Sequence, residues 1–384
     1  MEGIDIIGDV HGMHVRLVRL LGRLGYRRIG GTWSHAEGRR LVFVGDYIDG
    51  GDRPKEAVEL VGELCNDGVA LALAGNHDTN AVAFCMRSST VEFDGRAAWL
   101  ARSAGDAPGW LRPHSEKNLR QHAATLAAFQ DPVEYEATVR ALMRLPIWLE
   151  LPSLRVVHAA WVPQSIAFLE RWCAERGLES LGIRAESIDE AIQIQRQRQV
   201  PDVRHWHELL RMPPCARANE LRPDANEQVA LERIVKGVEL DLPDGLEFTD
   251  GRGHPQRAIR IRWFDAARDR TYHEHALMRP GDVADLRARL PAKLIPASTD
   301  RGALVSDLIP FDREQAYGAP ERPVLFGHYA LFDRGDPAVG KVLAPNVACV
   351  DLGAAYEGVG GRLAAYRWSG ERSLCMANFV DDGG

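Results

Sequence analysis

Side chains that can bind metal ions end or follow five short apolar runs of this sequence. The runs are 4–7, 41–44, 69–74, 154–158 and 323–326. The side chains at their ends are Asp9, His11, Asp46, Asp49, Asn76, His77, Asp78, His158 and His328. Carboxylate oxygens and neutral imidazoles are good ligands for Mn, Fe and Zn. The pattern therefore indicates metal chemistry, and the number of donors suits a site with two metal ions.

The apolar runs have the lengths of β-strands, and in the first 80 residues they alternate with helical patterns. Apolar side chains recur at helical spacing over 15–24 and 57–64. This alternation predicts a parallel sheet with helices on its faces. Ligands of such sheets bind outside the carboxyl ends of the strands. The metal-capable side chains are therefore expected to meet at one rim.

The remainder of the chain has weaker patterns. Residues 80–150 favour helices and contain no evident strand. The polar stretch 163–320 has strand candidates at 236–242 and 247–263. A terminal β-meander is expected, with strands at 346–351, 362–368 and 373–379. We therefore expect three parts, which are the first half of a core at 1–162 with a helical segment at 80–150, an insertion or cap subdomain at 163–320, and the second half of the core at 321–384.

Composition narrows the class of protein. The chain has 384 residues, of which 45% are hydrophobic and 26% charged, as in globular proteins. A net charge of −7 disfavours a general nucleic-acid or membrane-surface binder. Six cysteines without a CxxC pair are typical of reduced thiols. No signal peptide and no apolar run long enough for a membrane span is evident, so we expect a cytoplasmic protein without a membrane partner.

The motifs at the ends of the apolar runs resemble those of a known family. GDVHG at 8–12, GDYIDGG at 45–51, GNHD at 75–78, VHA at 157–159 and FGH at 326–328 are similar to the successive motifs of the calcineurin-like metallophosphoesterases. The match is best with the phosphoprotein-phosphatase branch and its bacterial relatives. These include symmetrical diadenosine tetraphosphatase-like and serine/threonine phosphatase-like proteins. The N-terminal part also resembles the phosphatase domain of bacterial polynucleotide kinase-phosphatase.

The resemblance implies a four-layer α/β/β/α sandwich of the metallophosphatase type, with a large insertion, and a role for each motif residue. Asp9 and His11 would hold a first metal ion, and Asp46 would bridge both ions. Asn76, His158 and His328 would complete the second ion's ligands. Mn is the favoured metal, with Fe or Zn as alternatives.

The resemblance also implies a mechanism of phosphoester or phosphoanhydride hydrolysis. A hydroxide that bridges the two metal ions would attack phosphorus in line. His77 would donate a proton to the leaving oxygen, and Asp78 would orient His77 and favour its protonated form. Asp49 would hold the loop or a neighbouring imidazole without touching the metals.

Two positions depart from the family pattern. Ala330 stands where many of these esterases have a histidine, so the first metal would have three protein ligands and more water. Gly50 stands where the phosphoprotein-phosphatase branch has the arginine of a DRG motif, which binds the substrate phosphate. Arg53 is the sequence candidate for that role.

The missing arginine and the insertion favour a nucleotide or dinucleoside polyphosphate as substrate. The alternatives are a serine/threonine phosphoprotein, a nucleic-acid end, or a non-catalytic binding role. Because every ligand position is filled, the sequence favours an enzyme over a binding protein.

Overall fold

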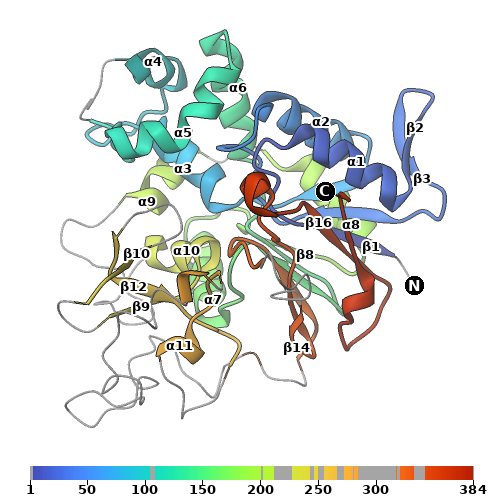
Figure 1. Cartoon of the computed structure of the whole chain (residues 1–384). Coiled ribbons are helices and arrows are strands. Elements are labelled where there is room, and N and C mark those ends of the chain that lie inside the picture. The colour runs from blue at the N-terminus through green and yellow to red at the C-terminus, as the bar shows by residue number, and fades with distance from the viewer. Residues whose placement is uncertain are drawn as a thin grey trace.

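The computed structural model of the chain describes residues 3–103, 109–199, 202–211, 227–242, 246–249, 255–265, 272–279, 281–283, 317, 321–332 and 342–383. Within these residues, two large β-sheets lie face to face between helices (Figure 1). None of the described helices is both long enough and apolar enough to cross a membrane.

The first sheet has the strand order β17-β16-β1-β4-β5. Its parallel part consists of β1 (Ile4–Ile7), β4 (Arg40–Phe43) and β5 (Ala70–Ala72), which are three of the strands predicted from the sequence. Next to β1, β16 (Ala364–Trp368) and then β17 (Phe379–Asp381) add an antiparallel edge.

The second sheet has the order β14-β15-β13-β7-β6-β8. Its central strand β13 runs parallel to both β7 and β15, while β6 is antiparallel to β7. The bounds are β14 (Val342–Ala344), β15 (Val347–Cys349), β13 (Val324–Phe326), β7 (Arg155–Val157), β6 (Trp148–Glu150) and β8 (Ile183–Arg184).

An apolar core between the two sheets joins them. Ile4, Ile6 and Val42 of the first sheet share this core with Val156 and Leu325 of the second, and all five are fully buried. Because successive side chains of a strand point to opposite faces, the neighbouring positions of each strand face the helices instead.

Helices cover the outer faces of both sheets. On the first sheet, the apolar sides of α1 (His14–Leu24) and α2 (Pro54–Asn66) share a core with Ile7 and Phe43. On the second sheet, α7 (Pro163–Glu175) and α10 (Glu227–Lys236) pack against each other and share a core with Phe326. The four-layer α/β/β/α sandwich expected from the sequence is confirmed.

Residues 80–150 are mainly helical, as predicted. They contain the end of α3 (Asn76–Phe84), then α4 (Gly95–Leu100), α5 (Glu116–Ala128) and α6 (Pro132–Leu142), with a 3₁₀ turn at Ala101–Ser103. Side-chain caps explain where α5 and α6 begin, since Ser115 and Asp131 each accept a backbone N–H of the helix that follows. Beyond the second sheet, shorter 3₁₀ segments occur at Ala354–Val359 and Met376–Asn378.

The predicted insertion is not uniform. Its first part adds β8 to the second sheet, and α8 (Ile188–Gln197) packs against β5. Its later part contains α9 (Val203–Leu210), α10, α11 (Tyr272–His275) and two separate strand pairs. The pairs are β9 (Glu239–Asp241) with β12 (Ala258–Arg260), and β10 (Phe248–Thr249) with β11 (Pro255–Gln256).

Two sequence expectations about strands were wrong, and one strand pair was missed. The helical segment ends in a strand, β6, whose three residues are too short to show periodicity. A hairpin of β2 (Tyr26–Ile29) and β3 (Thr32–His35) was not predicted. The terminal strands do not form one meander, because β15 joins the second sheet while β16 and β17 join the first.

Candidate metal centre

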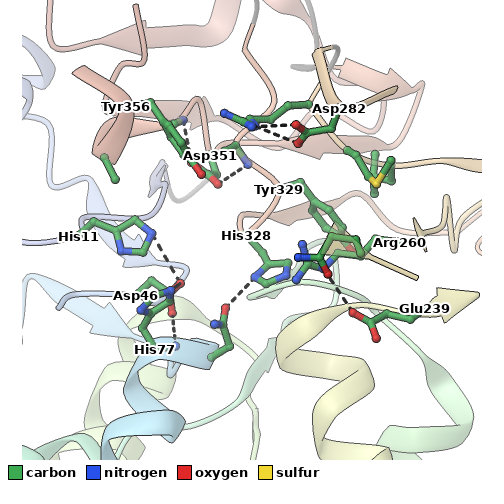
Figure 2. A pocket seen from close by; sticks show the side chains of 18 of the residues that line it. His11, Asp46, His77, Glu239, Arg260, Asp282, His328, Tyr329, Asp351 and Tyr356 are labelled. Carbon is green, nitrogen blue, oxygen red and sulfur yellow. Dashed lines mark hydrogen bonds and ion pairs between the residues drawn. The ribbon is translucent and has the colours of Figure 1, made fainter. Parts of the chain in front are cut away.

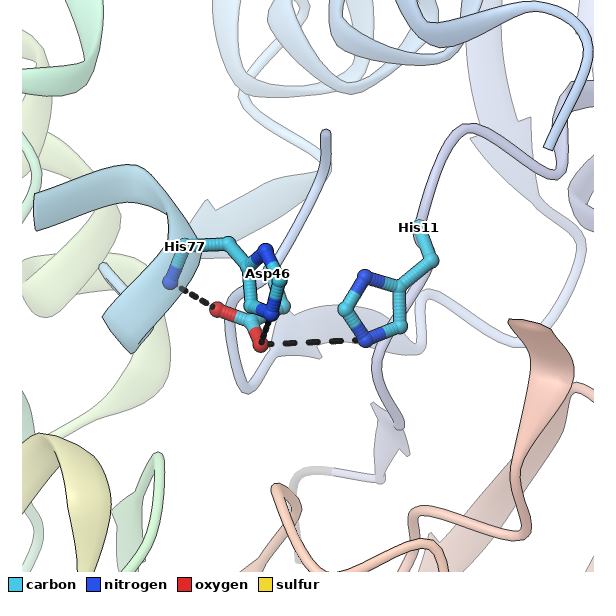
Figure 3. A group of neighbouring side chains, drawn as sticks. All are labelled: His11, Asp46 and His77. Carbon is cyan, nitrogen blue, oxygen red and sulfur yellow. Dashed lines mark hydrogen bonds and ion pairs between the residues drawn. The ribbon is translucent and has the colours of Figure 1, made fainter. Parts of the chain in front are cut away.

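The ends of five strands meet at one rim, where they bring together side chains from distant parts of the chain. Among the described residues, two groups of potential metal ligands form there, and they share Asp46; Figure 3 shows the first of them. In each group the ligand atoms all lie within 4.8 Å of one another. The first group is His11, Asp46 and His77, and the second is Asp46, His158 and His328.

The first group is arranged around one oxygen of Asp46. His11 Nε2 lies 3.8 Å from Asp46 Oδ2, and His77 Nε2 lies 4.0 Å from the same atom (Figure 3). The other ring nitrogen of His11 donates to the Ile48 carbonyl at 3.1 Å. Because this bond takes the Nδ1 proton, Nε2 of neutral His11 keeps its lone pair toward Asp46.

The second group is arranged around Asn76. In the orientation that satisfies its neighbours, the Asn76 amide nitrogen lies 2.7 Å from His328 Nδ1, 3.1 Å from His158 Nε2 and 3.3 Å from Asp46 Oδ2. His158 Nδ1 donates to the Val44 carbonyl at 3.0 Å, which directs its Nε2 lone pair inward. Three lone pairs therefore converge on one small region, which is the arrangement that a cation requires.

Burial holds the two histidines of the second group in the neutral form. Removal from water lowers the pKa of His158, and it lowers the pKa of His328 well below the ordinary value. Metal ions bind neutral imidazole. Burial works in the opposite direction on Asp46, but the nearby His158, His77 and His11 outweigh it and lower the pKa of this carboxyl.

Asp9 belongs to the same rim but lies to one side of both groups. Its carboxylate accepts the His328 backbone N–H at 3.1 Å, and Oδ2 lies 3.9 Å from His11 Nε2. Burial, followed by the nearby carboxylates of Asp351 and Asp46, raises the pKa of Asp9 well above the ordinary value. A bound cation would offset this concentration of negative charge.

Asp351 is a residue of the rim that the sequence analysis missed. It is buried beside Asp9, and it accepts the backbone N–H groups of Ala330 and Gly353 at 2.5 and 2.8 Å. Asp351 follows the apolar run 347–350 of the sequence. The pattern that identified the other rim residues could therefore have found it.

The carboxylate that contacts His77 is Asp49 of the GDYIDGG motif and not Asp78 of the GNHD motif. Asp49 Oδ2, not Asp78, accepts a hydrogen bond from His77 Nδ1, at 2.9 Å. Asp78 instead accepts the backbone N–H groups of Gly75, Asp46 and Tyr47 at 2.8, 2.9 and 3.2 Å. The expectation that Asp78 orients His77 is thus corrected, because the Asp78 carboxylate is occupied by the turns around it.

Asp49 is itself held by the helical segment. His122 Nδ1 donates to Asp49 Oδ1 at 2.5 Å, and the Thr125 hydroxyl donates to the same oxygen at 2.7 Å. Burial opposes the charge, but His122 and His77 outweigh it and lower the pKa of Asp49 far below its ordinary value. On its far side, His122 Nε2 lies 2.9 Å from the Tyr135 hydroxyl. No sequence pattern connected His122 with the site.

The backbone of the rim is strained. The described non-glycine residues with positive φ are His11, Asp46, Asp49, His328 and Ala330. Such conformations cost about 1–3 kcal/mol each and concentrate at functional sites. Gly75 is required for a different reason, because a Cβ there would lie 2.1 Å from Asp46 Oδ1 and 2.7 Å from His158 Cε1.

These observations fit a centre that holds metal ions. Buried carboxylates and neutral imidazoles converge around Asp46. The residues of the two groups could bind divalent cations on either side of Asp46. Mg-type sites use oxygen ligands alone, whereas this mixture of imidazole and carboxylate suits transition metals.

A pocket of about 240 Å³ opens from the rim. One side consists of His11, Asp46, Asn76, His77, His328 and Asp351, and the opposite wall comes from β9–β12 and residues 277–279 and 282 (Figure 2). Arg53, the sequence candidate for phosphate binding, is not among the residues that line the pocket. Its side chain is half exposed, and its guanidinium lies 3.7 Å from Asp52.

Known proteins are similar in sequence to part of this chain. The asymmetrical bis(5'-nucleosyl)-tetraphosphatase PrpE of Oceanobacillus iheyensis is 30% identical over 164 residues, which are 42% of this chain and 58% of that protein. PrpE of Halalkalibacterium halodurans is 42% identical over 73 residues, or 19% of this chain and 30% of that protein. The match thus spans less than two thirds of either relative. Both names specify the asymmetrical enzyme, whereas the sequence analysis named symmetrical relatives.

Among solved structures, a cold-active protein tyrosine phosphatase aligns with 97% of this chain and 78% of its own, at 14% identity and a TM-score of 0.40. That score is too low to support an argument. The family model for calcineurin-like phosphoesterases matches residues 3–224, which is more than half of the chain and includes four of the five motifs. This chain therefore belongs to the calcineurin-like phosphoesterase family.

Proposed function

We propose that this protein is a metal-dependent phosphoesterase that hydrolyses a nucleotide or dinucleoside polyphosphate. The observation that carries the proposal is the pair of ligand groups that share Asp46, with His77 of the first group in the first turn of α3. We propose two metal ions, with Mn favoured. Asp9, His11 and Asp46 would hold one ion. Asp46, Asn76, His158 and His328 would hold the other, with the Asn76 amide turned so that its oxygen is the ligand.

Bound divalent cations would supply positive charge for the phosphoryl oxygens and would acidify a water molecule. The protein's own residues hold and donate the proton that the leaving group needs. Asp49 accepts from His77 Nδ1, so this bond stabilises a protonated imidazole. Protonated His77 can then donate the Nε2 proton to the leaving oxygen, which is the step that general acids accelerate.

Gln121 lies beside the nitrogen that would carry that proton, and its amide N–H faces the lone pair that Nε2 has in the neutral ring. Its side-chain nitrogen lies 3.4 Å from His77 Nε2, and its oxygen accepts from Arg112 at 2.7 Å. The His77 ring is thus held from both sides, by Asp49 on one nitrogen and by Gln121 near the other. A leaving group that enters the pocket would meet Nε2 on its open side.

The dimensions of the pocket support a small substrate. Its volume of about 240 Å³ is near the lower limit for small-molecule sites, and a second wall closes it opposite the rim. The names of the PrpE relatives point to dinucleoside tetraphosphates. A phosphoserine or phosphothreonine protein is the alternative substrate that the test must distinguish.

The test is a substrate panel on purified, Mn-loaded protein. It compares an aryl phosphomonoester, its phosphodiester analogue, diadenosine tetraphosphate and a phosphothreonine peptide, with the Asp46→Asn protein as the inactive control. We expect the highest kcat/KM with diadenosine tetraphosphate. Preferential cleavage of the peptide would replace this proposal with the phosphoprotein alternative, and no turnover of any phosphoester with metals bound would favour a binding role.

A further inference from the structure

The wall opposite the metal rim carries an arginine whose donors are largely unused. Arg260 is the last residue of β12, where it pairs in register with Glu239 of β9. Both side chains line the same pocket as His328 and Tyr329 (Figure 2). The segment that carries Arg260 is separated from the rim motifs by long stretches of sequence, so only the fold brings it to the site.

The contacts of Arg260 leave one edge of its guanidinium open. Nε donates to the Lys236 carbonyl at 3.1 Å and lies 3.9 Å from Glu239 Oε1. Neither terminal nitrogen has a hydrogen-bond partner within the described part of the chain. The side chain keeps 39% of its surface exposed. Arg260 is therefore held through Nε and presents its terminal N–H groups for another acceptor.

The other arginine of this wall is already neutralised. Arg279 donates to both oxygens of Asp282, at 3.1 and 2.8 Å, and its guanidinium carbon lies 4.7 Å from the centre of the Tyr356 ring. Its charge and its planar face are thus used within the protein. Of the two arginines that line the described part of this wall, Arg260 is thus the one that can bind an anionic ligand.

Arg260 is near the rim but does not touch it. Burial is the largest cause that lowers the pKa of His328, and the positive charge of Arg260 is the second. The same charge also lowers the pKa of His158. Arg260 forms no hydrogen bond to the rim side chains. Because Arg260 and the rim side chains line one pocket, an anion at Arg260 would lie close to a phosphoryl group at the rim.

We propose that Arg260 binds a second, non-reacting phosphate of the substrate and so gives the site a preference for polyphosphates over phosphomonoesters. Guanidinium groups bind phosphate oxygens through two parallel N–H bonds, for which the free edge of Arg260 is suited. Phe248 and Leu277 line the pocket next to it and offer apolar surface for the remainder of a nucleotide. This inference rests on the proposed phosphoesterase function and specifies its substrate class.

The test uses the metal-loaded, full-length chain and the variants Arg260→Gln and Arg260→Lys. Arg257→Gln is the matched control, because Arg257 is in the same segment, 83% exposed and outside the pocket lining. We expect Arg260→Gln to lower kcat/KM for diadenosine tetraphosphate by about tenfold to a hundredfold, as the loss of charged hydrogen bonds does. Turnover of an aryl phosphomonoester should stay within about twofold. The kcat/KM of Arg260→Lys for diadenosine tetraphosphate should lie between that of Arg260→Gln and that of the unaltered protein. Arg257→Gln should match the unaltered protein with both substrates.

A binding measurement gives a readout that does not depend on turnover. In a His77→Ala background, calorimetry with ADP should show weaker binding after Arg260→Gln, by about tenfold or more, while orthophosphate binding should change little. Equal losses for both ligands and both substrates would mean that Arg260 holds the reacting phosphate, which overturns the inference. Unchanged polyphosphate kinetics in Arg260→Gln would also overturn it and leave the proposed function standing. Absence of any turnover by the unaltered, metal-loaded protein would instead refute the proposed function itself.

Discussion

The rim that carries Asp46 and the wall that carries Arg260 face the same pocket, but they hold their side chains differently. Asp46 and His158 are at most 1% exposed, and both have hydrogen-bond partners inside the protein. The wall consists of strand pairs only two or three residues long, and Arg260 is 39% exposed. The rim therefore holds its side chains by burial and hydrogen bonds, whereas Arg260 of the wall keeps part of its surface open to a ligand.

The side chains of the rim are hydrogen-bonded to segments that follow strands of both sheets. His158 of the second sheet bonds to the Val44 carbonyl next to the first sheet, and His328 offers its backbone N–H to Asp9. Both contacts cross between the two sheets. Loss of a rim residue should thus disturb chemistry for every substrate, whereas loss of a wall residue should change the choice among substrates.

The largest effect is expected from Asp46→Asn, because both groups of ligands lose their shared charge. Metal ions contribute several kcal/mol of transition-state stabilisation, so turnover of all substrates should fall by at least about a thousandfold. Metal content measured by atomic emission should fall with it. Asp189→Asn, which alters an exposed carboxylate paired with Arg40, is the control. Retained activity in Asp46→Asn would rule out a centre built around this residue.

His77→Ala should separate proton transfer from metal binding. We expect kcat to fall by about 10²–10⁴-fold, with metal content unchanged. The loss should be smaller for aryl phosphates with acidic leaving groups, since these need no proton. A comparison of two aryl phosphates of different leaving-group pKa measures this. If the metals are lost together with activity, His77 is a ligand of the first group and not the acid.

His122→Leu should have an intermediate effect, because His122 supports Asp49, which in turn supports His77. Removal of such supporting groups costs about 10–100-fold in activity. We expect a lower kcat with little change in KM, and partial recovery in His122→Asn, whose amide can still donate to Asp49. Thermal unfolding of each variant separates this role from general destabilisation. Equal activity of the two variants would argue against positioning by hydrogen bonding.

The smallest effect is expected from Arg53→Ala. Its guanidinium is half exposed and outside the lining of the pocket, so kcat/KM for diadenosine tetraphosphate and for aryl phosphate should both stay within about twofold. Unchanged kcat/KM values would show that Arg53, unlike Arg260, does not contribute to phosphate binding. A tenfold loss with both substrates would return the role of phosphate binding to Arg53.

Much of the rim could be predicted because its signal is local. An apolar run that ends in a polar residue marks the carboxyl end of a buried strand, and β1, β4, β5, β7 and β13 all follow this rule. Parallel neighbours place those ends at one edge. One strand and one rim residue were missed because their local patterns were too short or were misassigned. The strand β6 has only three residues, and Asp351 followed an assumed meander instead of a strand of the second sheet.

Contacts between distant segments could not be predicted. The sequence motifs favoured Asp78 as the partner of His77, and only the folded turns show that backbone N–H groups occupy Asp78. His122 reaches Asp49 from another helix, and Arg260 reaches the pocket from a strand pair far along the chain.

The sequence by itself determined the five strands that end at the rim, the polar residues at their ends and the family, because these depend on neighbouring residues and on the fixed geometry of parallel sheets. The tertiary structure decided which carboxylate supports His77, which arginine faces the pocket and which sheet each terminal strand joins. Those choices depend on burial and on distances between segments that share no local pattern, so they exist only once the two sheets have packed together.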